Sequence, residues 1–339
     1  MGGLAPAATL LPATFRMMQL ILVAQLFVGG MLILYMDEVI SKWGFGSGVS
    51  LFIAAGVSSQ IIIRAFSPLT TAGTWAFGTG EAPVGKVWVL FQSLIGGNPA
   101  GAALALAAII GTIVVFLLSV YGQAMKVEIP LSFGRIRGHG IRWPLNFIYT
   151  SNIPVILVAA LMANVQLLAR LLESWGRPIL GTFTGSVPAT GFVAWIDAPN
   201  LVEKIITGSF RAIDLAHSSV FALFMVIGAV IFSVFWVQTA GMDAKSQARQ
   251  IMASGLQIPG FRRDPRVLEQ ILNRYIWPLT IMGAIAVGIL ASSADLLGAL
   301  SRGTGILLAV MIIYKLYEEI AQQHMMDMYP ALRKMMGGS

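Results

Sequence analysis

The sequence contains no cysteine and few charged residues, and both absences narrow the classes of protein it can encode. Disulfide bridges, thiolate metal sites and cysteine nucleophiles are excluded, because none of the 339 residues is Cys. Charged residues make up only 11% of the chain, whereas an ordinary soluble domain carries about 25%. Hydrophobic residues instead make up 57%, and the mean hydropathy is +0.79. The composition therefore predicts a polytopic membrane protein.

Patterns typical of catalysis and nucleotide binding are also missing. The histidines His139, His217 and His324 lie on different segments, without carboxylates at the spacing of a metal site. No GxxxxGK[ST] motif occurs to hold phosphates. We therefore expect no enzyme activity, no metal and no cofactor. The net charge of +7 is modest and acts through its position beside apolar spans, so it does not indicate DNA binding.

The N-terminal stretch MGGLAPAATLLPATFRMMQ lacks the basic region and short apolar core of a cleaved signal peptide. We expect the spans themselves to direct membrane insertion. The sequence shows neither a tandem repeat nor a low-complexity region. A bundle of distinct helices is therefore expected.

Seven segments are long and apolar enough to cross about 30 Å of hydrocarbon as helices. They lie near residues 14–36, 48–65, 103–125, 148–171, 214–238, 277–298 and 303–321. Segment 84–96 is too short to span and is predicted to be an interfacial helix. Segment 178–200 is predicted to be a surface loop that can hold a hairpin.

Basic residues are concentrated in alternate connections between these spans. Segments 126–147 and 243–276, together with the C-terminal tail, contain most of them. Connections 66–102 and 172–213 contain far fewer bases per residue, and the short connection 299–302 holds only Arg302. Because Lys and Arg accumulate in cytoplasmic loops, this asymmetry predicts that the C-terminus is cytoplasmic and that the second set of connections lies outside.

The first four spans hold essentially no ionisable residue in their middle thirds, and Asp295 and Lys315 stand toward the ends of theirs. A transporter or pump normally carries such residues near mid-bilayer. A secondary transporter or ion channel for small solutes, built from broken helices, is therefore kept only as an alternative function. A purely structural membrane scaffold is a third possibility.

Polar residues interrupt the span near 148–171. Asn152 and Pro154 stand at its beginning and Asn164 near its middle. An unpaired amide in the membrane costs about 1–3 kcal/mol, so Asn164 should face a partner helix or water. Pro154 removes one backbone donor and permits a bend. A hinged, functional helix and an ordinary helix–helix hydrogen bond both fit this pattern.

Four stretches resemble the SecY family, the channel subunit of the protein-secretion translocon, and most closely its archaeal branch. They are DEVISKWGFGSGVSLFIAAGVSSQII (37–63), MKVEIPLSFGRIRGHGIRWPLNFIYTSNIPVIL (125–157), FWVQTAGMDAKSQARQIMASGLQIPGFRRDPRVLEQILNRYIWPLT (235–280) and RGTGILLAVMIIYKLYEEI (302–320). The resemblance implies an all-α, SecY-like membrane helix bundle that corresponds to the fourth to tenth helices of a ten-helix family. We expect a further segment to supply the first three helices and the plug.

The same resemblance implies a division into two halves. Residues 1–66 would be two helices of the N-terminal half, and 67–102 the external connection with its interfacial helix. Residues 103–321 would be the C-terminal half of five helices, followed by a cytoplasmic tail at 322–339.

The function implied is a protein-conducting channel that translocates unfolded secretory chains and releases apolar segments laterally into lipid. A collar of aliphatic side chains passes a polypeptide yet dewets and blocks ions when empty. By their place in the matching motifs, Val49, Ile53, Ile156 and either Leu307 or Leu308 would form this pore ring. Val49 and Ile53 are four residues apart, on one helical face. Ordinary packing or lipid-facing aliphatics are the alternative interpretation.

The resemblance also assigns a gate and a docking surface. Asn164 is similar to the polar residue of the family's lateral gate, with Asn152 and Pro154 in the same segment. Two basic loops would dock a ribosome by pairing with its phosphates, or would dock a motor ATPase. Membrane topology and contact with lipid head groups are the simpler explanation for the basic residues of these loops. Their basic residues are Arg135, Arg137, Arg142, Arg262 and Arg263. The implied partners are SecE-like and small third translocon subunits, the ribosome, the signal recognition particle pathway, unfolded secretory polypeptides and membrane lipid.

Overall fold

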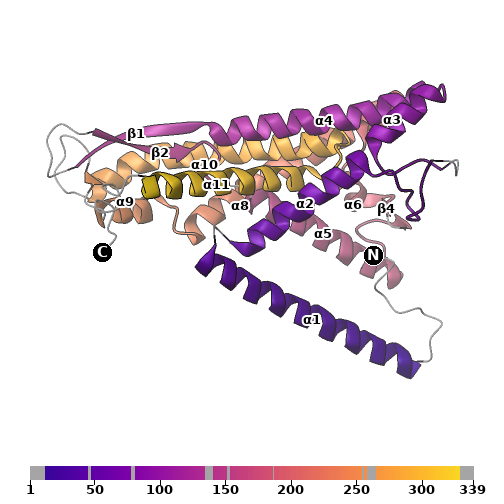
Figure 1. Ribbon diagram of the computed structural model, residues 1–339, viewed down its shortest axis with the longest axis horizontal. Coiled ribbons are helices and arrows are strands. Elements are labelled where there is room, and N and C mark those ends of the chain that lie inside the picture. The colour runs from indigo at the N-terminus through magenta and orange to yellow at the C-terminus, as the bar shows by residue number, and fades with distance from the viewer. Residues whose placement is uncertain are drawn as a thin grey trace. The chain divides into compact units, whose positions relative to one another are not determined.

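The computed structural model describes two units of the chain, which share helices α2 (Gly48–Phe66) and α11 (Gly303–Met328). One unit comprises residues 1–56 and 312–339, and the other residues 57–311. The described residues are 12–44, 47–77, 81–133, 140–150, 153–185, 187–253, 256–257 and 265–328. Figure 1 shows the elements of both units.

Six helices within the described ranges are long and apolar enough to cross a membrane. They are α1 (Pro12–Trp43), α2, α4 (Pro99–Ala124), α5 (Ile153–Ser174), α8 (Ala212–Thr239) and α10 (Pro265–Leu296). The predicted all-α membrane class and six of its seven spans are thus confirmed. The seventh, 303–321, forms part of α11 but carries Lys315, Glu318 and Glu319, and its crossing stays a prediction.

Proline stands in the first turn of two helices, α10 and α5, that begin at other residues than predicted. α10 begins at Pro265, twelve residues before the predicted start at 277, with proline at its first position, where the missing N–H costs nothing. It then continues through Pro278. α5 begins at Ile153 and not at 148, because residues 147–150 form a turn. Pro154, in its first turn, is compatible with the helix.

The short segments between spans are structured as well. The helix predicted at 84–96 is α3 (Lys86–Ile95), which packs against α4. The hairpin predicted within 178–200 is present as β3 (Phe183–Thr184) and β4 (Val187–Pro188), an antiparallel pair. Two short helices, α6 (Gly191–Ile196) and α7 (Leu201–Ile206), follow it.

Segment 126–147, which was expected to be a loop, forms a β-hairpin. β1 (Lys126–Phe133) and β2 (Gly140–Asn146) pair in antiparallel register from Lys126–Asn146 to Ser132–Gly140, and β5 (Leu256–Gln257) pairs with the end of β1. Ile129 and Leu145 are buried, and Val127 and Trp143 pack against the same cluster, which is the two-residue periodicity of a half-buried strand. Beside β5 in the sequence, α9 (Ala244–Ala253) buries Ala248 and Ile251 in this cluster.

The core of the second unit lies where α5, α8 and α10 meet, with contributions from the start of α11. α8 turns a buried stripe inward at steps of three and four residues, which is helical periodicity. Its members are Asp214, Ser218, Phe221, Met225, Ala229, Ser233 and Val237. Small residues bring the backbones together: a Cβ on Gly228 would lie 2.7 Å from the Val158 side chain, and one on Gly288 3.0 Å from the Val226 Cα. Such small-residue contacts are typical of membrane helix pairs.

Polar contacts fix the turn that leads into α5. The Ser233 hydroxyl donates to Thr150 Oγ1 at 2.9 Å and lies 3.2 Å from the Thr280 carbonyl oxygen. The Tyr149 hydroxyl donates to the Met242 carbonyl oxygen at 2.6 Å. The beginning of α5 is therefore tied to α8 and to the segment that follows it.

Candidate functional site

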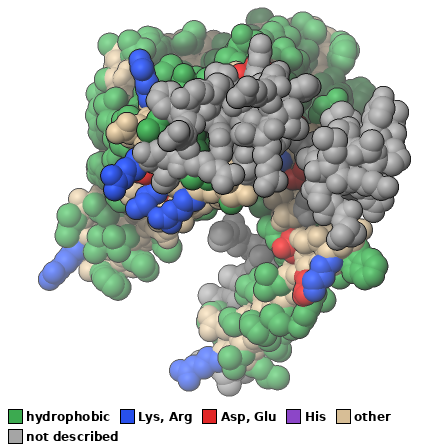
Figure 2. All heavy atoms as spheres, turned by 90° about the vertical axis from the view of Figure 1, so that its left-hand side faces the viewer, with side chains coloured by type: hydrophobic (Ala, Val, Ile, Leu, Met, Phe, Trp, Pro, Cys, Tyr) green, Lys and Arg blue, Asp and Glu red, His purple; other side chains and the backbone are tan. Residues whose placement is uncertain are grey.

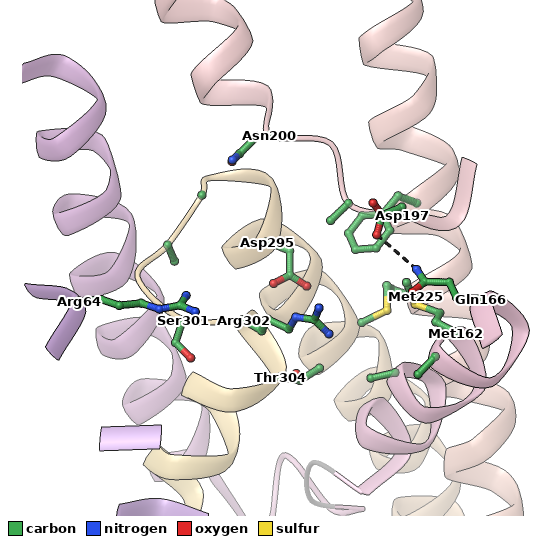
Figure 3. Close-up of a pocket in the computed structure, with 16 residues that line it drawn as sticks. Arg64, Met162, Gln166, Asp197, Asn200, Met225, Asp295, Ser301, Arg302 and Thr304 are labelled. Carbon is green, nitrogen blue, oxygen red and sulfur yellow. Dashed lines mark hydrogen bonds between the residues drawn. The ribbon is translucent and has the colours of Figure 1, made fainter. Parts of the chain in front are cut away.

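A polar cavity of about 320 Å³ lies among the helices of the second unit. Its walls come from α5, α8, the ends of α2 and α10, the start of α11 and the segment after α6 (Figure 3). Hydrophilic side chains from five of these segments, and from the turn between α10 and α11, converge on it. They are Arg64, Gln166, Asp197, Asn200, Asp295, Ser301, Arg302 and Thr304. Two carboxylates and two guanidinium groups thus line one space between apolar helices.

Asp295 connects the end of α10 to the beginning of α11. Its carboxylate oxygen Oδ1 accepts a hydrogen bond from the Gly303 N–H at 2.7 Å. Gly303 is the first residue of α11, where backbone N–H groups have no partner within the helix. The carboxylate therefore satisfies one of these donors and carries negative charge at the positive end of the helix dipole.

Arg64 and Thr112 together hold the turn between α10 and α11. The Arg64 Nη1 atom donates to the Leu300 carbonyl oxygen at 3.0 Å, and the Leu300 N–H donates to Thr112 Oγ1 at 2.8 Å. The turn contains Gly298 at φ +65°, a conformation that favours glycine. Both backbone groups of Leu300 are therefore bonded to helices other than the two that the turn connects.

On the other side of the cavity, α5 approaches the segment after α6. The Gln166 Nε2 atom lies 3.4 Å from Asp197 Oδ1, a long hydrogen bond that Figure 3 marks as a dashed line. The side chains of Met162 and Met225 lie nearby and supply flexible apolar surface. The cavity wall on this side is therefore more weakly bonded than the α10–α11 turn.

Two of the predicted pore residues extend the cavity-lining faces of their helices. Ile156 is half-buried, and it stands one turn before Ala159, which lines the cavity with Ala163 and Gln166. Residues spaced by three, four and seven share one face of a helix, so Ile156 continues this face of α5. Leu308 stands four residues after Thr304 and is half-buried likewise.

Leu307, the other candidate in α11, has a different environment. It is only 3% exposed and packs in the cluster formed by Val155, Val158, Phe221 and Met225. Leu308 therefore has more of the free surface that a pore ring needs. The assignment of either residue to a ring stays a prediction.

Val49 and Ile53 lie in the first unit, near the start of α2. The Val49 N–H donates to Asp37 Oδ1 at 3.0 Å, and the Ser47 hydroxyl donates to the same oxygen at 3.0 Å. Asp37, from the last part of α1, thus serves as the N-terminal cap of α2. Ile53 lies in the second turn of the helix and is 42% exposed.

The predicted gate residues all belong to α5 or the residues just before it. Asn152 lies outside the described residues. Pro154 is buried in the first turn, and Asn164 is exposed, with its Nδ2 atom donating to the Ala160 carbonyl oxygen at 2.9 Å. The Asn164 side chain therefore stands at the surface of this chain, with one bond to its own helix, and its role in a gate stays a prediction.

The predicted docking arginines are only partly described. Arg135, Arg137, Arg262 and Arg263 lie outside the described residues, and Arg142 is described through its backbone, which pairs with Pro130 in the hairpin. β5 pairs with β1 through Ser132–Gln257 and Phe133–Leu256, so the segments on which the two loops stand form one sheet. Figure 2 looks onto this end and shows Lys and Arg side chains (blue) on its surface. Exposed basic residues of α9 and the first half of α10 include Lys245, Arg249, Arg266 and Arg274.

The charged lining of the polar cavity was not predicted from the sequence. Arg64, Asp295 and Arg302 stand at helix ends, where charged residues are common, and nothing in their spacing brings them together. The only signal was the position of Asp295 at the end of an apolar span. Within the described ranges, no three His, Asp or Glu side chains converge as metal ligands.

Comparison with known proteins gives concordant results for sequence and structure. The SecY family model matches residues 3–317. Protein translocase subunit SecY of Pyrococcus furiosus is 45% identical over 327 residues, which cover 94% of this chain and 68% of that protein. The corresponding subunit of Methanocaldococcus jannaschii is 41% identical, with 93% of this chain and 67% of that protein covered.

Solved structures of channels are similar as well. A structure described as that of a protein conducting channel is 41% identical and has a TM-score of 0.76, covering 97% of this chain and 70% of that one. Sec61 in the canine ribosome–channel complex from the endoplasmic reticulum is 40% identical with a TM-score of 0.71, again covering 97% and 70% of the two chains. The helix arrangement and the sequence thus agree.

Proposed function

This chain belongs to the SecY family, and we propose that it is the part of a protein-conducting channel that guides unfolded secretory polypeptides across the membrane. The observation that carries this proposal is the continuous face of α5, on which Ile156 precedes the cavity-lining Ala159, Ala163 and Gln166. An aliphatic constriction that opens into a polar cavity suits a polypeptide, because it seals without binding and then offers water and hydrogen bonds.

The pore ring would combine Val49 and Ile53 of α2 with Ile156 and Leu308. Each is aliphatic and at least partly exposed in this chain. Flexible apolar side chains can close around chains of any sequence, and they exclude ions by dewetting when nothing passes.

Ile156→Asn tests the ring in channels in which a co-expressed segment supplies the three helices expected before α1. The amide should hydrate the constriction and raise the resting ion conductance in planar bilayers. Leu161→Asn is the matched control, because Leu161 is 41% exposed on the opposite face of α5. The resting ion conductance of the Leu161→Asn channel should equal that of the parent channel. Equal conductance of all three channels would assign Ile156 to packing.

Lateral release of apolar segments into lipid would involve α5, with Asn152, Pro154 and Asn164 as gate residues. The support is the exposed Asn164 amide and the firm attachment of the preceding turn through Thr150 and Tyr149. A helix held at one end and polar at its exposed middle can swing between a closed and an open position.

The basic end of the second unit would dock the ribosome. Arg142 belongs to β2, and Arg135, Arg137, Arg262 and Arg263 follow β1 or β5 in the sequence. Because β1 pairs with both β2 and β5, these arginines would present their charge together to rRNA phosphates. Further partners are SecE-like and small third subunits and the signal recognition particle pathway. The chain would itself catalyse no reaction, and a partner would supply the energy for translocation.

We also infer that the C-terminus and the β1–β2 hairpin are cytoplasmic and that Thr184 lies outside. The distribution of Lys and Arg supports this orientation. In this Cys-free chain, cysteines introduced at Gly138 and Gly260 should react with impermeant thiol reagents from the cytoplasmic side only, and one at Thr184 from the outside only. Labelling of Gly260→Cys from outside would reverse the orientation.

A further inference from the structure

A second cavity, of about 410 Å³, lies between β4, α6, α7 and the beginning of α8. It shares only Asp197 and Ala198 with the polar cavity described above. Its walls are largely apolar, with Pro188, Pro199 and Ile213 among them. We call it the His217 cavity, because the side chain of His217 supplies its most unusual group.

The Nε2 atom of His217 is buried and has no hydrogen-bond partner among the described residues. It is the only buried side-chain nitrogen or oxygen in that part of the chain with this property. Leaving such a group without a partner costs about 1–3 kcal/mol, so native structures normally satisfy it. An occupant of the cavity beside His217 that forms a hydrogen bond with imidazole would supply this missing partner.

The charges around the cavity favour a cation as this occupant. The Lys204 ammonium forms an ion pair with Asp214 Oδ1 at 2.5 Å, so these two charges cancel. Asp214 Oδ2 also accepts a hydrogen bond from the Arg211 N–H at 2.8 Å, which leaves this carboxylate fully engaged. Within the described ranges, the hydrogen bond of Asp197 is the long one to Gln166 at 3.4 Å. Of the two carboxylates in this lining, Asp197 is therefore the one that can accept hydrogen bonds from a positive group.

An aromatic wall strengthens this preference. The Trp195 ring lies 5.6 Å from the His217 ring, centroid to centroid, at an angle of 61°. Indole faces attract organic cations through their quadrupole. α6, which carries Trp195, is held in place by Val193 and Ile196, each 1% exposed. The wall is therefore preformed and does not depend on the occupant.

We propose that the His217 cavity binds an organic molecule through a primary ammonium group. The N–H donors of the ammonium would bond to His217 Nε2 and to the Asp197 carboxylate, and Trp195 would cover one side. A quaternary ammonium has the same charge but no N–H group, so it would satisfy neither acceptor. Selectivity for primary over quaternary ammonium is therefore the defining property of this site.

The position of the cavity points to a lipid head group as the source of the ammonium. His217 stands five residues after Ala212, the first residue of α8, which is about 7.5 Å along the helix axis. This depth falls in the head-group region if α8 begins at the membrane surface. Val220 and Ile227, which lie farther along α8 and are 40% and 49% exposed, would face the acyl chains.

The test compares lipids that differ only in the head group. The purified full chain is equilibrated in micelles with equal amounts of phosphatidylethanolamine and phosphatidylcholine of identical acyl chains, and retained lipid is measured by native mass spectrometry. We expect about tenfold more phosphatidylethanolamine, as one hydrogen bond to a charged group implies. Equal retention of the two lipids by the unmodified chain overturns the proposal, and this comparison requires no variant.

Two variants locate the site. His217→Phe keeps an aromatic ring and removes the nitrogen, and Asp197→Asn removes the charge. Each variant should lower the selectivity for phosphatidylethanolamine. Glu81→Gln, which makes the same charge change at an exposed position outside the cavity, should leave it unchanged. Unchanged selectivity in both cavity variants overturns the assignment, and if His217→Phe fails to fold, Asp197→Asn decides alone.

Competition with a soluble amine distinguishes the two possible sources of the ammonium group, a lipid and a free amine. Ethanolamine, added in place of lipid competitor, should displace phosphatidylethanolamine only weakly if the acyl chains contribute to binding. Displacement at equal concentration would keep the ammonium site and identify a soluble amine as its ligand. The conductance of the Ile156→Asn channel is independent of both results, so the channel function is tested separately.

Discussion

Thr112→Val should loosen the attachment of the α10–α11 turn. The Thr112 hydroxyl donates to the Ala108 carbonyl oxygen at 2.7 Å and accepts the Leu300 N–H at 2.8 Å. Thr112 and Leu300 are only 7% and 6% exposed, so water cannot replace the lost partner. Valine has nearly the same shape and leaves the Leu300 N–H buried without an acceptor. We expect a loss of about 1–2 kcal/mol in the free energy of unfolding.

This loss corresponds to a factor of about 5–30 in the unfolding equilibrium constant. It can be measured by titrating the micelle-bound chain with sodium dodecyl sulfate and following tryptophan fluorescence, since the chain contains 8 Trp. Thr239→Val is the matched control. The Thr239 hydroxyl is exposed and donates only to carbonyl oxygens of its own helix, at 3.0 and 3.2 Å, so its removal orphans no backbone donor. Equal unfolding curves for the two variants would refute a stabilising role for the Thr112–Leu300 bond.

Two further predictions concern the end of the second unit that carries the β1–β2 hairpin. Burial, with a smaller contribution from the charge of Asp243, raises the pKa of Tyr149 to about 12. The protonated phenol therefore stabilises the fold below pH 10, and this stabilisation is lost as the pH rises to about 12. The difference in the free energy of unfolding between the parent and Tyr149→Phe should shrink over this range. A difference that stays constant would contradict the raised pKa of Tyr149. Arg262→Glu should weaken co-sedimentation with ribosomes and flatten its salt dependence, because phosphate contacts release counterions. Lys334→Glu, the same charge change in the tail, should do neither, and identical binding curves would remove Arg262 from the docking surface.

Much of the architecture could be predicted because the membrane imposes a local rule. Each backbone N–H and C=O must be satisfied within the bilayer, so a long apolar segment is almost necessarily a helix. That rule identified the apolar segments from 14–36 to 277–298, and basic loops supported an orientation. It did not predict the β1–β2 hairpin, whose alternating Val127, Ile129 and Trp143, Leu145 lie outside the spans.

The candidate site was likewise predictable from the sequence only in part. The aliphatic pore candidates could be proposed because they stand in motifs that resemble a family, and Ile156 and Leu308 proved to continue cavity-lining faces. Between Leu307 and Leu308 the sequence could not choose, since adjacent residues of a helix differ by about 100° in direction. Only the packing of α11 against α5 and α8 showed that Leu307 is buried.

The sequence by itself determined that this protein is a helical membrane protein of the SecY family, because composition, span length and motif order are properties of consecutive residues. The tertiary structure alone decided which polar groups meet. Arg64 and Leu300 are 236 positions apart, and Thr112 and Leu300 are 188 apart, yet they bond directly. His217 became notable only when its nitrogen was found buried beside Trp195 without a partner. A hydrogen bond depends on distance in space, and no local pattern along a chain records which distant residues the helix packing brings together.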